Sequence, residues 1–323
     1  MPRDTRAAGW RGRLAAAWRR LKRLFIASFF LLVAVLLVNY GRHVDWRAVW
    51  AVLQSFSAGT LALAAACGAA SYALYCSYDL LARRHVGHEL PRPQVAAVGF
   101  VSYAFNLNLG SLVGGVGLRY RLYSRLGLAL DTITQVLAFS VVSNWLGYLA
   151  LAGAAFVFFP LALPPDWALD STGLRWVGVV LIVSAVAYVG LCFARGRRRI
   201  TLRGRSFAVP SGPTALLQLA LSCTNWMLIA GVITLLMNGR LDYVSALSVL
   251  LIAAVAGVVA HIPAGLGVLE GVFVALLVHR VPQPELLAAL IAYRAVYYIA
   301  PLGLALAVFL LLERRWTARP PRP

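Results

Sequence analysis

The sequence predicts an all-α polytopic membrane protein with six full transmembrane helices and two re-entrant helical hairpins, arranged as an inverted repeat. Of its 323 residues, 61% are hydrophobic and only 13% are charged, whereas a soluble domain is about half apolar and about a quarter charged. The 30 Lys and Arg residues gather in a few clusters, and two apolar stretches are interrupted by glycine or proline. The composition excludes an ordinary water-soluble enzyme or a disordered chain.

The N-terminus is predicted to be a basic cytoplasmic arm, residues 1–23, followed by a first span at 24–40. The arm contains eight Lys or Arg residues. A basic segment before an apolar run also begins a secretory signal peptide, but no small-residue cleavage site follows here. We therefore expect an uncleaved signal anchor whose arm is flexible or lies on the anionic leaflet surface.

Six apolar segments are long enough to cross a bilayer, because a membrane helix needs about 20 mostly apolar residues. They are residues 24–40, 58–78, 133–159, 174–194, 214–237 and 286–312. Two further stretches, 95–126 and 244–279, are apolar but contain the centres NLNLGSLVGGVG and HIPAGLGVLEG. We expect these two stretches to enter the membrane as hairpins rather than as ordinary spans.

The basic residues predict which side each loop occupies, because cytoplasmic loops are enriched in Lys and Arg. Of the 30 basic residues, 24 fall in five clusters, at 1–23, 83–92, 119–125, 195–205 and 314–322. If all five are cytoplasmic, the first interrupted stretch enters and leaves at the inner face, and the second at the outer face. Both termini are then cytoplasmic, and the loop at 160–173, which has no Lys or Arg, lies outside.

This topology divides a single transmembrane domain, residues 24–312, into two units of inverted orientation at about 58–159 and 214–312, with a cytoplasmic tail at 313–323. Corresponding landmarks of the units are offset by about 149 to 157 positions. Paired interrupted segments in inverted halves indicate a transporter binding site near the bilayer midplane. The alternative is eight or more ordinary helices in which GxxxG glycines promote close packing.

Charged residues inside apolar spans are rare and are usually paired or functional. At 1.5 Å per residue, Glu270 lies about 15 Å and Arg294 about 13 Å from the outer side. The two residues form either a structural salt bridge or a site in which Arg294 holds an anionic headgroup while Glu270 balances it. Tyr298, one turn after Arg294, belongs to the same face or serves packing. Asp79 is expected to reach water and is assigned no chemistry.

Other candidates lie on the hairpins themselves. Arg119, about 9 Å below Arg125 on the return arm of the first hairpin, is either a ligand for a lipid phosphate or an orientation signal. The glycines of each GxxxG pair either pack helices or let backbone N–H groups face a ligand. His261, next to Pro263 at the turn of the second hairpin, is either a proton relay or an ordinary hydrogen-bonded residue.

The segments NLNLGSLVGGVGLRYRLYSRLGL and HIPAGLGVLEGVFVALL resemble the two signatures of the membrane region of lysylphosphatidylglycerol synthases and of their stand-alone, YbhN-like inner-membrane relatives. The resemblance covers about residues 20–312 and implies a flippase-type membrane domain. The soluble domain of the synthases is not found in the sequence, so aminoacyl transfer is not implied. The resemblance assigns these cavity-lining positions: Gly114, Gly115, Arg119, Tyr120 and Arg121 in the first signature, and Pro263, Gly265, Gly267 and Glu270 in the second.

We therefore expect a bacterial inner-membrane lipid translocase that moves an anionic phospholipid or a related lipid between leaflets. Arg119, Arg121 and Arg294 would attract the headgroup. One alternative is a membrane enzyme acting on a hopanoid or polyprenyl-linked substrate, with Glu270 or His261 as acid or base. The other is a membrane scaffold.

The sequence contains no P-loop, GxSxG, HExxH, CxxC or paired-aspartate motif. No catalytic residue, metal or cofactor is therefore predicted, and the protein is expected not to be an enzyme. The expected partners are membrane lipids, with a homodimer or a separate lipid-modifying enzyme as further possibilities. Because the basic residues serve as orientation signals, no nucleic-acid partner is expected.

Overall fold

The computed structural model describes residues 42, 44–159, 171–195, 198–202, 205–260, 262 and 265–317. The chain divides into two compact units, Met1–Arg47 and Ala48–Pro323. The predicted N-terminal arm and first span, most of the predicted outer loop and the end of the tail lie outside the described residues.

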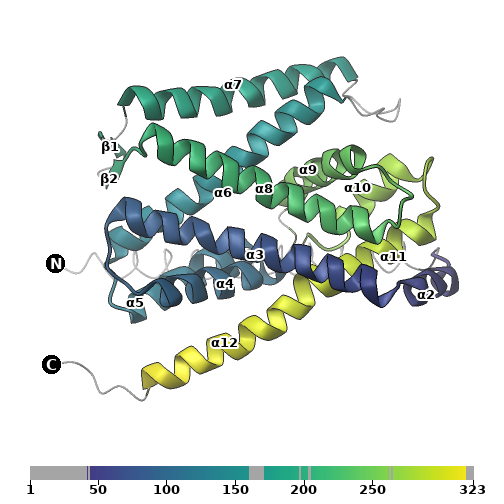
Figure 1. Cartoon of the computed structure of the whole chain (residues 1–323), viewed down its shortest axis with the longest axis horizontal. Coiled ribbons are helices and arrows are strands. Elements are labelled where there is room, and N and C mark those ends of the chain that lie inside the picture. The colour runs from purple at the N-terminus through teal and green to yellow at the C-terminus, as the bar shows by residue number, and fades with distance from the viewer. Residues whose placement is uncertain are drawn as a thin grey trace, which may run out of the picture. The chain divides into compact units, whose positions relative to one another are not determined.

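The described residues are almost entirely helical, as Figure 1 shows. The elements are α2 (Trp46–Ser55), α3 (Ala58–Val86), α4 (Arg92–Leu109), η1 (Ser111–Gly117), α5 (Leu118–Arg125), α6 (Leu130–Phe158), α7 (Ser171–Arg195), β1 (Arg199–Leu202), β2 (Arg205–Ala208), α8 (Gly212–Leu236), α9 (Tyr243–Ala260), α10 (Val268–Leu277), α11 (Gln283–Arg294), η3 (Ala295–Ile299) and α12 (Ala300–Thr317). Two of them, η1 and η3, are π-helical. The strands β1 and β2, of four residues each, form an antiparallel pair that the sequence did not predict.

The prediction of an all-α multi-pass membrane protein is confirmed. Within the described residues, six helices are long and apolar enough to cross a membrane: Ala58–Val86, Leu130–Phe158, Ser171–Arg195, Gly212–Leu236, Tyr243–Ala260 and Gln283–Arg314. Five of them coincide with predicted spans. The remaining one, Tyr243–Ala260, lies at the start of the stretch 244–279 for which the sequence predicts a hairpin. It is an 18-residue helix, about 27 Å long at 1.5 Å per residue.

A polar stripe on α8 ties the bundle together. Gln218, Ser222 and Asn225 are fully buried, and their spacing of four and three places them on one helix face. Gln218 Nε2 donates to Ser143 Oγ of α6 at 2.8 Å, and Ser71 Oγ of α3 donates to Asn225 Oδ1 at 2.7 Å. Side-chain hydrogen bonds of this kind link helices in apolar surroundings, where the hydrophobic effect does not drive helix association.

The segment of α4, η1 and α5, called the first hairpin below, reverses direction at Gly110. Gly110 has φ 84° and ψ 167°, a conformation open to glycine but rarely to other residues. The π-helix then lies directly against the end of α4. A Cβ atom on Gly114 would stand 2.2 Å from the carbonyl atoms of Phe105 and 2.4 Å from the nitrogen of Asn106. Only a glycine permits this approach.

Helices α9 and α10 form a second hairpin, in which the two helices pack against each other. Arg240, before α9, forms a salt bridge of 3.4 Å with Glu285 at the start of α11. Arg280, after α10, lies 3.5 Å from Ser245 Oγ at the start of α9. These contacts hold the entry and exit of the hairpin together. In Figure 1, α5 lies toward the left end of the bundle, whereas α9, α10 and α11 lie toward the right.

The connection between α3 and α4 contains a histidine with two unpartnered ring nitrogens. Both nitrogens of His88 are buried without a hydrogen-bond partner. Burial, and to a lesser extent the charge of Arg83, lower the pKa of His88 below its ordinary value. Because protonation then favours the unfolded chain, His88 lowers the stability of the fold increasingly as the pH falls below its unfolded pKa of about 6.5, and it has no such effect well above that value.

We therefore expect His88→Phe to raise the unfolding temperature in detergent and to flatten its pH dependence between pH 7.5 and 5.5. The substitution removes buried polar atoms that lack partners, each of which costs about 1–3 kcal/mol. His279→Phe, at an exposed position, is the matched control and should keep the wild-type pH profile. An unchanged pH profile in the His88→Phe variant would contradict this assignment.

Candidate functional site

Two bidentate arginine–carboxylate pairs lie within the bundle, one beside each hairpin. Asp79 of α3 pairs with Arg119 of α5, and Glu270 of α10 pairs with Arg294 at the end of α11. Bidentate pairs combine charge with two directed hydrogen bonds and are among the stronger polar contacts in proteins. The two pairs differ in burial and therefore in what they can do.

The pair beside the first hairpin is closed. Arg119 Nε and Nη2 each lie 3.1 Å from an oxygen of Asp79, and the two side chains are 2% and 0% exposed. Tyr123 donates to the carboxylate at 2.9 Å and Ser140 at 2.5 Å. The expectation that Asp79 reaches water is wrong, because the return arm of the first hairpin covers it. The guanidinium of Arg119 is occupied, so binding a lipid phosphate would require the pair to separate.

The other predicted residues of the first hairpin are spread along its return arm. Tyr120 shares a hydrogen bond with Thr134 at 2.6 Å. Arg121 is 51% exposed and binds Glu313 of α12 at 2.9 Å, and Arg125 also binds Glu313. Gly114 and Gly115 face the end of α4. These residues hold the hairpin to its neighbours and do not form one cluster.

The pair beside the second hairpin is only partly covered. Arg294 binds Glu270 through Nε and, at 3.0 Å, through Nη2. The side chains are 13% and 15% exposed. Arg294 Nη2 also donates to the carbonyl of Gly265 at 3.0 Å, and the Gly267 amide donates to Glu270 Oε2 at 3.0 Å. Glu270 thus caps the first turn of α10, while Arg294 attaches the hairpin to the last span.

The last span changes its helical geometry directly after this pair. Residues Ala295–Ile299 form a five-residue π-helix, η3, between α11 and α12. Asn108 of the first hairpin donates to the carbonyl of Tyr298 at 3.3 Å. The guanidinium carbon of Arg294 lies 5.3 Å from the centre of the Tyr298 ring. Tyr298 therefore contacts both the first hairpin and Arg294, the residue that binds the second hairpin. Insertions of π-helix often mark functional positions.

A series of tyrosines connects η3 with the closed pair. Tyr297 shares hydrogen bonds with Ser71 Oγ at 2.6 Å and with Tyr103 at 3.0 Å. Tyr103 stacks on Tyr75 with ring centres 3.6 Å apart, and Arg119 lies 5.6 Å from the centre of the Tyr75 ring. The closed pair is thus joined to η3 through contiguous buried side chains.

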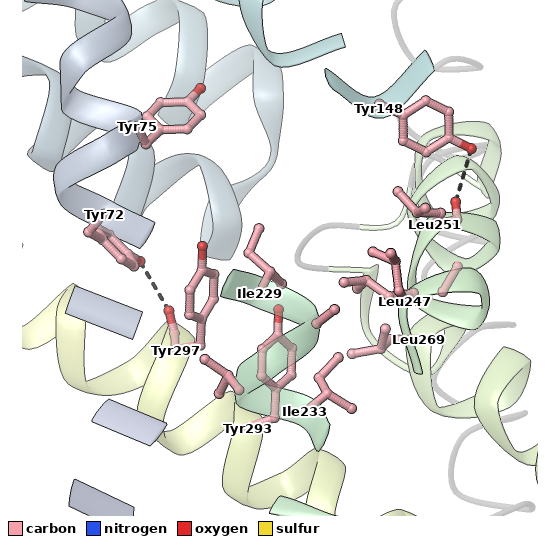
Figure 2. Packing of buried hydrophobic residues seen from close by; sticks show 14 of the residues in the cluster. Tyr72, Tyr75, Tyr148, Ile229, Ile233, Leu247, Leu251, Leu269, Tyr293 and Tyr297 are labelled. Carbon is pink, nitrogen blue, oxygen red and sulfur yellow. Dashed lines mark hydrogen bonds between the residues drawn. The ribbon is translucent and has the colours of Figure 1, made fainter. Parts of the chain in front are cut away.

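Figure 2 shows how the tyrosines meet the last span. Tyr72 donates to the main-chain carbonyl of Tyr297 at 3.1 Å, drawn as a dashed line. The rings of Tyr293 and Tyr297 stand side by side, with centres 5.4 Å apart. Pro301, four residues after Tyr297, has no N–H to donate, and the Tyr72 hydroxyl gives the Tyr297 carbonyl a partner.

The described structure brings five of the predicted site residues together at the start of α10: Glu270, Arg294, Tyr298, Gly265 and Gly267. Gly265 and Gly267 have φ values of 54° and 77°, in the left-handed region that favours glycine. His261 and Pro263 lie outside the described residues. Sequence reasoning did not foresee that Asn108 would meet Tyr298, or that Tyr297 would be the centre of a buried polar cluster.

Comparisons with known proteins agree with this architecture. The family model described as the lysylphosphatidylglycerol synthase TM region matches residues 23–305. The chain is 45% identical over 297 residues to inner membrane protein YbhN of Escherichia coli K12, and the aligned residues make up 92% of this chain and 93% of that protein. It is 32% identical over 311 residues to the Synechocystis protein slr0712, covering 93% and 96%. Identity to the phosphatidylglycerol lysyltransferase of Staphylococcus aureus strain COL is 24% over 294 residues, covering 88% of this chain and 33% of that enzyme.

Proposed function

Since the chain belongs to the family of the lysylphosphatidylglycerol synthase TM region, we propose that it is a lipid translocase of the bacterial inner membrane, which moves a lipid with a phosphate-bearing headgroup between leaflets. The observation that carries the proposal is that both hairpins contact one stretch of the last span, the first at Tyr298 of η3 and the second at Arg294 directly before it, where the ion pair is partly exposed. The chain spans only a third of the lysyltransferase, so lysyl transfer is not part of the proposal.

In this proposal both hairpins are re-entrant and enter the bilayer from opposite faces. The contact of Arg121 and Arg125 with Glu313 ties the foot of the first hairpin to the cytoplasmic end of the last span. The contact of Arg240 with Glu285 ties the foot of the second hairpin at the outer face. The basic clusters then lie in the cytoplasm, together with both termini.

The proposed mechanism uses the second pair as the headgroup site. A phosphate crossing the apolar region needs a charged partner, because an unpaired charge there is costly. Arg294 offers N–H donors beside Gly265, which its guanidinium already contacts. Gly265 lies in the turn between the apolar helices α9 and α10. Movement of α12 about the π-helical η3 would widen the approach from each leaflet in turn.

Reconstitution into vesicles tests this proposal. We expect the protein to accelerate transbilayer movement of an acyl-labelled phospholipid, and the double variant Glu270→Gln/Arg294→Gln to lose at least about 90% of that rate. The double variant removes both charges and leaves no single buried charge uncompensated. Arg240→Gln, in a pair where the arginine is 62% exposed, is the control and should retain the wild-type rate. Equal rates for the double variant and the wild type would defeat the proposal.

A further inference from the structure

The arrangement of charges at the second hairpin specifies the class of headgroup. We infer that the site accepts a zwitterionic headgroup, with a phosphate for Arg294 and an ammonium for Glu270, rather than a headgroup of net negative charge. This inference rests on the proposed translocase function and names its substrate class. It makes Glu270 the residue that determines specificity.

The first step of the argument is charge balance. Arg294 and Glu270 neutralise one another through two hydrogen bonds. A lipid with only a negative headgroup that displaced Glu270 from Arg294 would leave the carboxylate without a counterion. Removing one partner from a poorly hydrated pair is strongly unfavourable, because the other charge stays uncompensated. A headgroup that carries both signs replaces each half of the pair with a new partner.

The second step is access. Both side chains keep part of their surface open, 13% for Arg294 and 15% for Glu270. The pair at the first hairpin offers no comparable access, because Arg119 and Asp79 are 2% and 0% exposed. Tyr123 and Ser140 further occupy the carboxylate of Asp79. Of the two pairs, only that of Glu270 can exchange its internal partner for a ligand without dismantling the bundle.

The third step is the aromatic ring beside the pair. The guanidinium of Arg294 lies over the ring of Tyr298, 5.3 Å from its centre. A tyrosine ring attracts any cation placed over its face. When Arg294 turns toward a phosphate, an ammonium on the same headgroup can replace the guanidinium over the Tyr298 ring. The same ammonium can donate a hydrogen bond to Glu270. The site thus offers two partners for the cationic part of a zwitterion.

A pair of labelled lipids tests the inference in proteoliposomes. We expect the wild-type protein to move acyl-labelled phosphatidylethanolamine at least about tenfold faster than acyl-labelled phosphatidylglycerol. Glu270→Gln should abolish or reverse that preference, because it removes the partner of the ammonium and leaves Arg294 to hold an anionic headgroup. Glu270→Asp, which keeps the charge, should retain the preference. Glu285→Gln, in the pair at the foot of the hairpin, is the matched control.

The outcomes separate the inference from the proposed function. Equal wild-type rates for the two lipids, or faster movement of phosphatidylglycerol, would overturn the inference and leave the translocase intact. Movement of neither lipid would overturn the translocase itself. If Glu270→Gln does not fold, the inference is tested by whether the wild-type protein prefers phosphatidylethanolamine and whether Glu270→Asp keeps that preference. Loss of the preference in folded Glu270→Asp would count against the inference. An unchanged preference in folded Glu270→Gln also counts against it.

Discussion

Replacing Asp79 with asparagine is expected to destabilise the protein by about 3–5 kcal/mol, because it leaves the buried charge of Arg119 without its carboxylate. Arg119 is 2% exposed, so water cannot replace the lost partner. Denaturant titration of the purified protein in detergent measures the loss in the free energy of unfolding. We expect the folded fraction of Asp79→Asn, measured by size-exclusion chromatography, to fall in parallel.

The double variant Asp79→Leu/Arg119→Met separates a structural role of this pair from lipid binding. Apolar residues of similar volume often replace a buried ion pair without loss of stability. We therefore expect the double variant to recover most of the wild-type stability and to keep translocating lipid. A stable double variant that had lost translocation would show that Arg119 contacts the headgroup, contrary to the structure described above.

Substitution of Gly114 by alanine is the second change with a large expected effect. The new Cβ atom would stand 2.2 Å from the backbone of Phe105, so the π-helix and α4 would have to separate. Overpacking of this kind costs about 1–3 kcal/mol, and occasionally more where backbone must move. We expect a lower unfolding temperature and a first hairpin that is more accessible to protease.

Gly271→Ala is the matched control, because Gly271 ends the second GxxxG sequence. A Cβ atom there meets nothing within 4 Å, and alanine favours a helix over glycine by up to about 1 kcal/mol. Gly271→Ala should therefore be neutral or stabilising. Equal destabilisation by both substitutions would contradict the close packing assigned to Gly114 alone. The two GxxxG sequences look alike, yet their last glycines differ: Gly114 packs against backbone, and a Cβ atom on Gly271 meets nothing within 4 Å.

Hydropathy and glycine patterns were sufficient to predict most helices of the fold. The spans beginning near residues 58, 133, 174, 214 and 286 follow from apolar length alone, and Gly110 and Gly267 mark real breaks. The π-helices were not predictable, because they depend on tertiary contacts such as that of Tyr72 with the carbonyl of Tyr297. The short β1–β2 pair was also not predicted: Arg199–Leu202 alternates polar and apolar residues, but only over four positions, too short a stretch to indicate a strand by itself.

Part of the candidate site could be predicted from the rise per residue of a helix, which gives the depth of each charged residue in the membrane. Counting from the ends of their helices matched the depths of Glu270 and Arg294, and the structure pairs them. The same count inward from Arg83 and Arg125 places Asp79 at about 6 Å and Arg119 at about 9 Å from the same predicted face, close enough for the two to have been considered as a pair. The burial of Asp79 was not predicted, because its nearness to the helix end suggested contact with water and the hairpin that covers it was not taken into account. The tyrosine contacts join α3, α4 and η3, far apart in sequence, and required the fold.

Cysteine accessibility in spheroplasts tests most directly whether the two hairpins enter from opposite faces. Single cysteines at Glu89 and Ala129 flank the first hairpin, and single cysteines at Arg240 and His279 flank the second, in a variant without the four native cysteines. We predict that an impermeant maleimide labels positions 240 and 279 in intact spheroplasts, and positions 89 and 129 only after permeabilisation. Labelling that places the two flanks of either hairpin on different sides would contradict the account.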